Sequence, residues 1–242
     1  GSLLDYDYRS HAMYPMLAKR WTVSPDGLTY TFQLRHGIAF SDGHPITADD
    51  VLFSCEIYYD PVLHPSMQDL MMLDGRPFEV SAPDSYTVVF KIPHVYRLML
   101  SVVSGIRIMP RHILGPALLN GTYASAYNTS TPPESLVTSG AWRLEQFVQE
   151  DRTVLTRNPW WFRVDAKGQR LLYLDQLVFL ITPDQNAAAL KFSAGEIDGL
   201  DNVKNEDYKQ FEAGQAKGNY TLYDVGPSLN THIVWFNLNT VK

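Results

Sequence analysis

The residues that could carry out chemistry in this chain are few and scattered. The sequence contains one cysteine and seven histidines, and no two histidines stand at a metal-ligand spacing. No nucleophile-elbow, phosphate-loop, dinucleotide-binding or zinc-protease motif occurs. Asp49 and Asp50 are adjacent, but they fall in the first turn of a predicted helix, where carboxylates complement the helix macrodipole. We therefore expect no enzymatic activity, no cofactor, and no catalytic or metal site.

Composition favours a globular domain and excludes several classes of partner. Of the 242 residues, 45% are hydrophobic and 12% aromatic, which is enough to build a core. The net charge is −6 and no basic run occurs, so the chain has no mark of a nucleic-acid-binding protein. No run of 18 apolar residues is present. Cys55 falls on the apolar face of its predicted helix, which predicts a buried and inert thiol.

The elements near the N-terminus follow from local patterns. Residues 28–34 alternate apolar and polar side chains, which predicts a strand with one buried face. The turn Ser24-Pro25-Asp26-Gly27 precedes it. Thr47, with Asp50 three residues on, predicts the N-cap and capping box of a helix that ends before Pro61.

These same residues carry a resemblance to a known family. The stretch from Leu17 to Ser54 resembles the signature of the family 5 extracellular solute-binding proteins, the peptide-binding components of ABC importers. The matching residues are Leu17-Ala18, Trp21, Ser24-Pro25-Asp26-Gly27, Thr29-Tyr30-Thr31-Phe32, Leu34-Arg35, Gly37, Phe40, Asp42-Gly43, Pro45, Thr47-Ala48-Asp49-Asp50-Val51 and Phe53-Ser54, followed further on by Arg157-Asn158-Pro159-Trp160-Trp161 and Gly195-Glu196-Ile197-Asp198.

The resemblance implies a fold, a role and a location. It implies an α/β, periplasmic-binding-protein-like (type II) fold, here a fragment that lacks the second lobe. The implied role is capture of peptides or similar small solutes for an ABC permease in the membrane. The implied protein is a monomer in the periplasm or anchored at the cell surface, and Gly1-Ser2 resembles a cloning remnant. The alternative is the solute-sensing domain of a transcriptional regulator, which some relatives of this fold are.

The second half of the chain is patterned differently from the first. Residues 120–138 are polar and proline-rich, which predicts a surface loop and two subdomains, residues 1–135 and residues 136–242. A hairpin is predicted over 142–157, and the apolar run 173–181 predicts a strand buried on both faces. Thr182 to Gln185 predicts a capping box for the next helix. A polar helix from residue 205 and strands at 220–225 and 232–238 are predicted to follow. This order of strands and helices favours a largely parallel sheet.

Two stretches are the candidates for contact with a solute. In two-lobed α/β proteins, ligands bind where strands end and lobes meet. One stretch is the loop with Ser139, Gly140 and Trp142. The other is the last predicted strand, which carries His232, Trp235 and Asn237. Packing at a subdomain interface remains the alternative for that strand.

Overall fold

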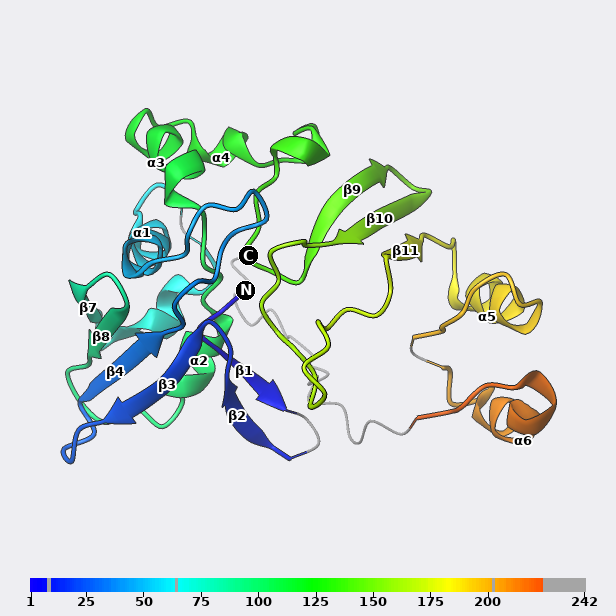
Figure 1. Ribbon diagram of the computed structural model, residues 1–242. Coiled ribbons are helices and arrows are strands. Elements are labelled where there is room, and N and C mark those ends of the chain that lie inside the picture. The colour runs from blue at the N-terminus through cyan, green and yellow to red at the C-terminus, as the bar shows by residue number, and fades with distance from the viewer. Residues whose placement is uncertain (8–9, 64, 202, 224–242) are drawn as a thin grey trace, which may run out of the picture. The chain divides into compact units, whose positions relative to one another are not determined.

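The structure, a computed structural model, describes residues 1–7, 10–63, 65–201 and 203–223 (Figure 1). The chain divides into two compact units, Gly1–Thr182 and Pro183–Lys242. The expected subdomain boundary at residues 135 and 136 lies within the first unit and stays a prediction. The helices of the described residues are α1 (Ala48–Tyr59), η1 (Gln68–Met71), α2 (Met99–Gly105), α3 (Arg111–Leu119), α4 (Tyr123–Ala126), η2 (Pro133–Ser135), α5 (Gln185–Ser193) and α6 (Tyr208–Gly218).

The strands of the described residues pair in four sheets, and all these pairings are antiparallel. The expectation of a largely parallel sheet is therefore wrong for this part of the chain, because its neighbouring strands are joined by hairpins or lie antiparallel across longer connections. The sheets are β1 (Leu4–Asp7) with β2 (Ala12–Pro15), the order β3-β4-β8-β7 (Ala18–Val23, Thr29–Leu34, Thr87–Lys91, Glu79–Asp84), β5 (Met72–Leu73) with β6 (Arg76–Pro77), and the order β11-β10-β9 (Gln176–Leu180, Arg152–Arg157, Trp142–Val148).

The main core lies between the four-stranded sheet and helices α1 and α2 (Figure 1). Alternate residues of β4, among them Phe32, are buried, as its sequence pattern predicts. On the next strand Phe90 is fully buried, and its ring meets that of Phe32 edge to face at 5.6 Å. From α1, Val51 and Cys55 enter the same cluster. The strand and helix predicted around residues 28–60 are thus confirmed.

The cap of α1 is the predicted one, with Thr47 as the N-cap and Asp50 completing a capping box. The carboxylate of Asp50 accepts hydrogen bonds from the Thr47 backbone N–H at 2.9 Å and from the Thr47 hydroxyl at 3.3 Å. The same carboxylate accepts from the backbone N–H of Arg111 at 3.2 Å, at the start of α3. Through these bonds Asp50 both caps α1 and links α1 to α3. Asp50 is 4% exposed, so the bonds are shielded from water. The predicted capping box is confirmed, and the bond from Arg111 is an addition to it that links α1 to α3.

Replacing Thr47 with alanine is expected to lower the free energy of unfolding by about 0.5 kcal/mol. Alanine removes the 3.3 Å hydrogen bond from the Thr47 hydroxyl to the Asp50 carboxylate. It keeps the 2.9 Å bond that the backbone N–H of residue 47 donates to the same carboxylate. Urea unfolding of the two proteins would measure the change. A loss beyond about 1.5 kcal/mol would show that the hydroxyl itself carries the cap.

The three-stranded sheet corrects the prediction of a strand buried on both faces. Among the described residues β11 is an edge strand that pairs only with β10, and all its apolar side chains except Leu177 are exposed. Val178 is 53% exposed and Phe179 is 55% exposed. A continuous apolar run identifies a strand, but it does not show what covers that strand. The hairpin of β9 and β10 is confirmed.

In the second unit, α5 begins later than predicted. Asp184 is its N-cap, and the Asp184 carboxylate accepts from the backbone N–H groups of Asn186 and Ala187. The predicted cap at Thr182 is therefore wrong by two residues. The rings of Phe192 on α5, Phe211 on α6 and Tyr220 pack together. Residues 220–223 form no strand, and the expected strand at 232–238 lies outside the described residues.

Candidate functional site

A cavity of about 790 Å³ opens beside the Ser139–Trp142 loop, within the first unit. It is lined by Gly1, residues 107–110, the polar loop 127–139 and strand β9. This size lies in the range of small-molecule sites. The lining residues are Gly1, Arg107, Ile108, Met109, Pro110, Tyr127, Asn128, Thr129, Ser130, Thr131, Pro132, Pro133, Leu136, Val137, Thr138, Ser139, Trp142, Leu144 and Phe147.

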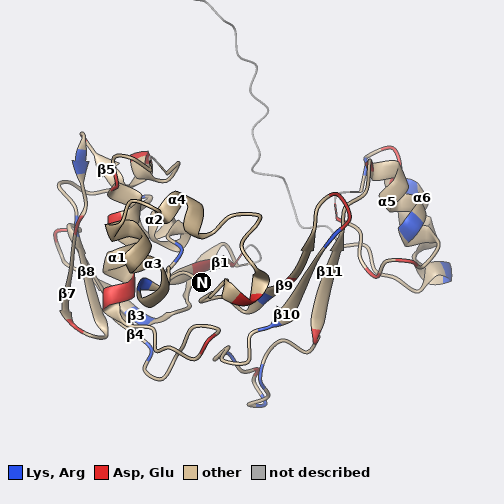
Figure 2. Ribbon diagram, turned by 90° about the horizontal axis from the view of Figure 1, so that it is seen from above, with Lys and Arg blue, Asp and Glu red and all other residues tan. Residues whose placement is uncertain are grey.

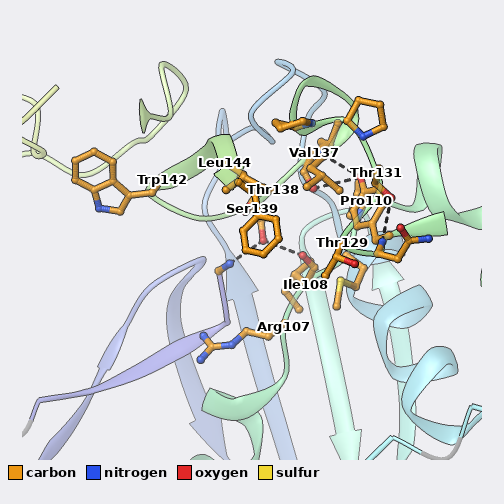
Figure 3. A pocket seen from close by; sticks show the side chains of 18 of the residues that line it. Arg107, Ile108, Pro110, Thr129, Thr131, Val137, Thr138, Ser139, Trp142 and Leu144 are labelled. Atoms are coloured by element: carbon orange, nitrogen blue, oxygen red, sulfur yellow. Dashed lines mark hydrogen bonds between the residues drawn. The ribbon is translucent and has the colours of Figure 1, made fainter. Parts of the chain in front are cut away.

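Ser139 stands at the centre of the polar contacts in this cavity (Figure 3). Its side chain is buried, and its hydroxyl donates to the Ile108 carbonyl at 2.8 Å. The same oxygen accepts from the amino nitrogen of Gly1 at 2.8 Å. Both hydrogen-bonding roles of the hydroxyl are thus filled by the protein, so Ser139 shapes the wall. Trp142 lies apart from this cluster in Figure 3.

Asn158 fixes the Ser139–Trp142 loop through hydrogen bonds to its backbone. Its side-chain amide donates to the Gly140 carbonyl at 2.8 Å, and its backbone N–H donates to the Ala141 carbonyl at 2.8 Å. Its side-chain oxygen accepts from the Trp160 backbone N–H, also at 2.8 Å. Asn158 is 2% exposed, so these bonds are shielded from water. Asn158 therefore positions the loop that carries Ser139 and Trp142.

The cavity wall is mostly apolar and carries one charged side chain among the described residues, Arg107. Its guanidinium forms no ion pair or hydrogen bond within the described part of the chain. The wall thus suits a solute with an apolar body and a neutral or negative polar group.

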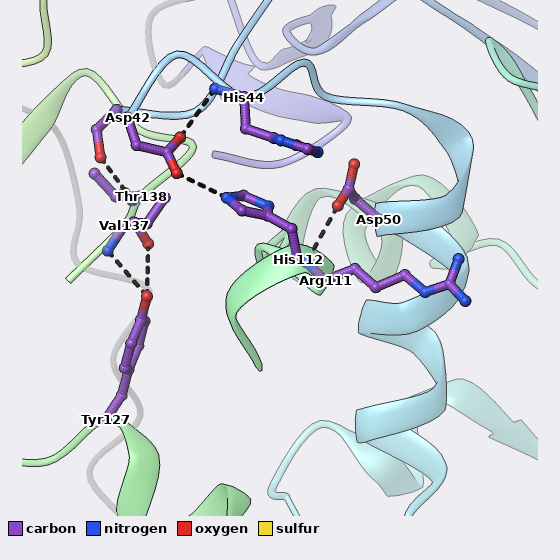
Figure 4. Close-up of polar contacts among 9 residues, drawn as sticks. Asp42, His44, Asp50, Arg111, His112, Tyr127, Val137 and Thr138 are labelled. Carbon is purple, nitrogen blue, oxygen red and sulfur yellow. Dashed lines mark hydrogen bonds and ion pairs between the residues drawn. The ribbon is translucent and has the colours of Figure 1, made fainter. Parts of the chain in front are cut away.

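A polar network braces the loop against the first half of the chain (Figure 4). Ser41 and Thr138 exchange two hydrogen bonds, at 2.9 and 3.0 Å. Beside them, Asp42 pairs with the ring of His112 at 2.7 Å, and the ring of His44 stacks on His112 at 3.8 Å. Burial raises the pKa of Asp42, but the bonds from His112 and from the His44 backbone N–H outweigh it and leave the pKa below its usual value.

These groups do not form a metal centre. Across residues 1–223, apart from the few that the structure does not describe, no three His, Cys, Asp or Glu side chains are placed to hold a metal ion. His44 and His112 stack face to face, and in that arrangement their rings do not converge on one ion. The network is therefore a brace for loop 127–139.

The structure places three of the six predicted contact residues. Ser139 and Trp142 line the cavity, whereas Gly140 lies outside the lining and contributes its carbonyl to Asn158. His232, Trp235 and Asn237 lie outside the described residues.

Most of the cavity wall could not be predicted from local patterns. Residues 120–138 are expected to form a surface loop, yet Leu136 and Val137 within them line the cavity. The alternation of Trp142 and Leu144 along β9 was a usable signal, because residues two apart on a strand face the same side.

Comparison with known proteins identifies the family. Residues 12–242 match the family described as bacterial extracellular solute-binding proteins, family 5 middle. A Deinococcus radiodurans relative, the "Probable ABC transporter-binding protein", is 30% identical over 228 residues, which are 90% of this chain and 38% of the relative. The periplasmic alpha-galactoside-binding protein of Rhizobium meliloti is 33% identical over 205 residues, 79% of this chain and 29% of that protein.

Solved structures agree on the fold. The oligopeptide-binding protein AppA of Bacillus subtilis, in complex with a nonapeptide, has a TM-score of 0.72 and 26% identity over 88% of this chain and 39% of that one. The chain thus spans about two fifths of that structure and less than two fifths of the two relatives. The mixed α/β fold expected from the sequence is confirmed. The chain belongs to the family 5 bacterial extracellular solute-binding proteins.

Proposed function

We propose that this chain is part of the solute-binding component of an ABC importer, which captures peptides or similar small solutes and delivers them to a membrane permease. The observation that carries the proposal is the family match over residues 12–242. A relative that is 30% identical bears the name of an ABC transporter-binding protein. The family is one of extracellular binding proteins, and no helix among the described residues is long and apolar enough to cross a membrane. The proposed place of action is the periplasm or the outer cell surface.

The cavity beside Ser139 and Trp142 is the proposed contact surface for the solute. Its apolar wall removes an apolar group from water, and the Arg107 guanidinium offers a partner for a carboxylate. A peptide supplies both, as apolar side chains and a C-terminal carboxylate. The names of relatives include an alpha-galactoside-binding protein and an oligopeptide-binding protein in complex with a nonapeptide, and the test below covers both classes of solute.

Binding of purified protein to a panel of peptides and oligosaccharides, measured by calorimetry, tests the proposal. Deletion of the gene in its own host should abolish uptake of the solute that binds. Binding of no solute in the panel, together with unchanged uptake in the deletion strain, would refute an import role. A protein that instead alters transcription in response to a solute would support the sensor alternative.

Replacing Trp142 with alanine is expected to weaken solute binding about tenfold, because an indole lining an apolar wall contributes on the order of 1.4 kcal/mol. Trp160→Ala is the matched control, since Trp160 is 53% exposed and outside the cavity lining. Calorimetry on both variants would measure the change. Equal losses in the two variants would remove Trp142 from the proposed site.

A further inference from the structure

A second pocket, of about 710 Å³, lies at one end of the β9–β10–β11 sheet. It shares no residue with the cavity beside Ser139. In Figure 2, blue segments lie at the end of β10 and in the loop below it, with a red segment at the neighbouring end of β11. The lining residues are Arg143, Thr156, Arg157, Asn158, Pro159, Arg170, Leu171, Asp175 and Gln176.

Strand geometry explains why the two pockets are separate. Successive side chains of a strand point to opposite faces of its sheet. Trp142 and Leu144 line the apolar cavity, and Arg143 between them lines the second pocket. Opposite Arg143 across the sheet stands Thr156, and opposite Thr156 stands Gln176. These three polar residues form one row across three paired strands, so the backbone beneath them is fixed.

The charge in this pocket is unbalanced. Three guanidinium groups line it, from Arg143, Arg157 and Arg170, against one carboxylate, that of Asp175. Asp175 pairs with Arg157 at 2.7 Å, and the Arg170 guanidinium donates to the Pro159 carbonyl at 2.7 Å. Arg143 forms no side-chain hydrogen bond or ion pair in the part of the chain that the structure describes. The chain as a whole has a net charge of −6, so this positive cluster is a local exception.

We propose that this pocket binds a small oxyanion, a carboxylate or a phosphate, at a site separate from the proposed solute cavity. A guanidinium presents a planar fork of N–H donors that fits either group through two parallel hydrogen bonds. Arg143 makes the primary contact because its fork is free. Arg157 and Arg170 add positive charge to the lining. The Glu145 carboxylate, nearby on β9, accepts from the Gln176 side-chain amide at 2.7 Å.

The test is titration of the protein with inorganic phosphate and with citrate at low ionic strength, followed by calorimetry. Arg143→Ala is expected to weaken binding of the preferred anion at least tenfold. Arg152→Ala is the matched control: Arg152 lies on the same sheet, is paired with Asp151 at 3.2 Å, and is outside this pocket. It removes the same charge, so a general electrostatic attraction would weaken equally in both variants. Arg143→Lys keeps the charge without the fork and is expected to bind with intermediate affinity.

A parallel arm separates a free anion from a lipid headgroup. Vesicles of neutral lipid and vesicles with one third anionic phospholipid are mixed with the protein and sedimented. Loss of vesicle binding in Arg143→Ala, without binding of phosphate or citrate, would assign the same oxyanion chemistry to a headgroup. Equal effects of Arg143→Ala and Arg152→Ala in both arms, or no binding in either, would overturn the site. Thermal melts verify that each variant is folded.

Discussion

Replacing Asp50 with alanine is expected to lower the free energy of unfolding by about 3 kcal/mol. Its buried carboxylate accepts from the backbone N–H groups of Thr47 and Arg111, and alanine leaves both donors unpaired. The loss separates the start of α1 from the start of α3, so two elements are affected at once. Denaturant unfolding would measure it.

The neighbouring carboxylate supplies the control. Asp49 stands in the same helical turn but is exposed, and its pair with the Arg111 guanidinium is long, at 3.7 Å. Asp49→Ala is expected to cost about 0.5 kcal/mol. Similar losses in the two variants would mean that the helix dipole, and not the buried hydrogen bonds, accounts for the stabilisation.

The pH dependence of Asp50 has a defined sign. Burial raises the pKa of Asp50 above its ordinary value of 3.8, and the bonds from Thr47 and Arg111 offset only part of that shift. The folded state then holds the proton more tightly than the unfolded state, so stability falls as the pH rises from 3.8 through the folded pKa. Asp50→Asn lacks this titration. As the pH rises through that window, the parent chain is expected to lose unfolding free energy relative to Asp50→Asn. Above the window the difference between the two proteins should stay constant.

Replacing Asn158 with alanine is expected to cost about 2 kcal/mol of stability and to weaken solute binding as well. Its amide is shared between the Gly140 carbonyl and the Trp160 N–H, and both partners would lose their bond inside the protein. The loop with Ser139 and Trp142 would then be held by fewer fixed contacts. Unfolding and calorimetry on one sample would measure both effects.

An exposed asparagine provides the comparison for this prediction. Asn186 accepts from Lys204 at 2.6 Å on the surface of the second unit. Asn186→Ala is expected to change stability by less than about 0.5 kcal/mol and to leave binding unchanged. Reduced binding in Asn158→Ala at unchanged stability would mean that the amide contacts the solute directly.

The first half of the fold could be predicted because its signals are local. The alternation in β4, the turn before it and the capping residues of α1 each lie within a few residues. The contact from Arg111 to Asp50 could not be predicted in this way, since it joins positions 61 apart and no local pattern shows it. The strand at 176–180 was found, but its burial was not, because burial depends on what lies across the sheet.

The candidate site could be predicted only in part, because most of its wall is formed by segments that are distant in the sequence. Ser139 and Trp142 follow from the place of their loop in the chain order, and both line the cavity. Most of the remaining wall comes from residues 107–110 and from the polar loop 127–139, which only the folded chain brings together. The arginine pocket was missed because its three basic residues are spread over 28 positions among neutral and acidic ones.

The burial of Cys55 makes the chain a convenient host for site-specific labels. Its thiol is 2% exposed, and burial raises its pKa to about 12, so almost no reactive thiolate forms at neutral pH. It is also the one cysteine of the sequence. A cysteine introduced at an exposed position such as Val178 should therefore react with a maleimide dye while Cys55 stays unmodified. Fluorescent reporters of solute binding can thus be attached without first removing the native thiol from the core.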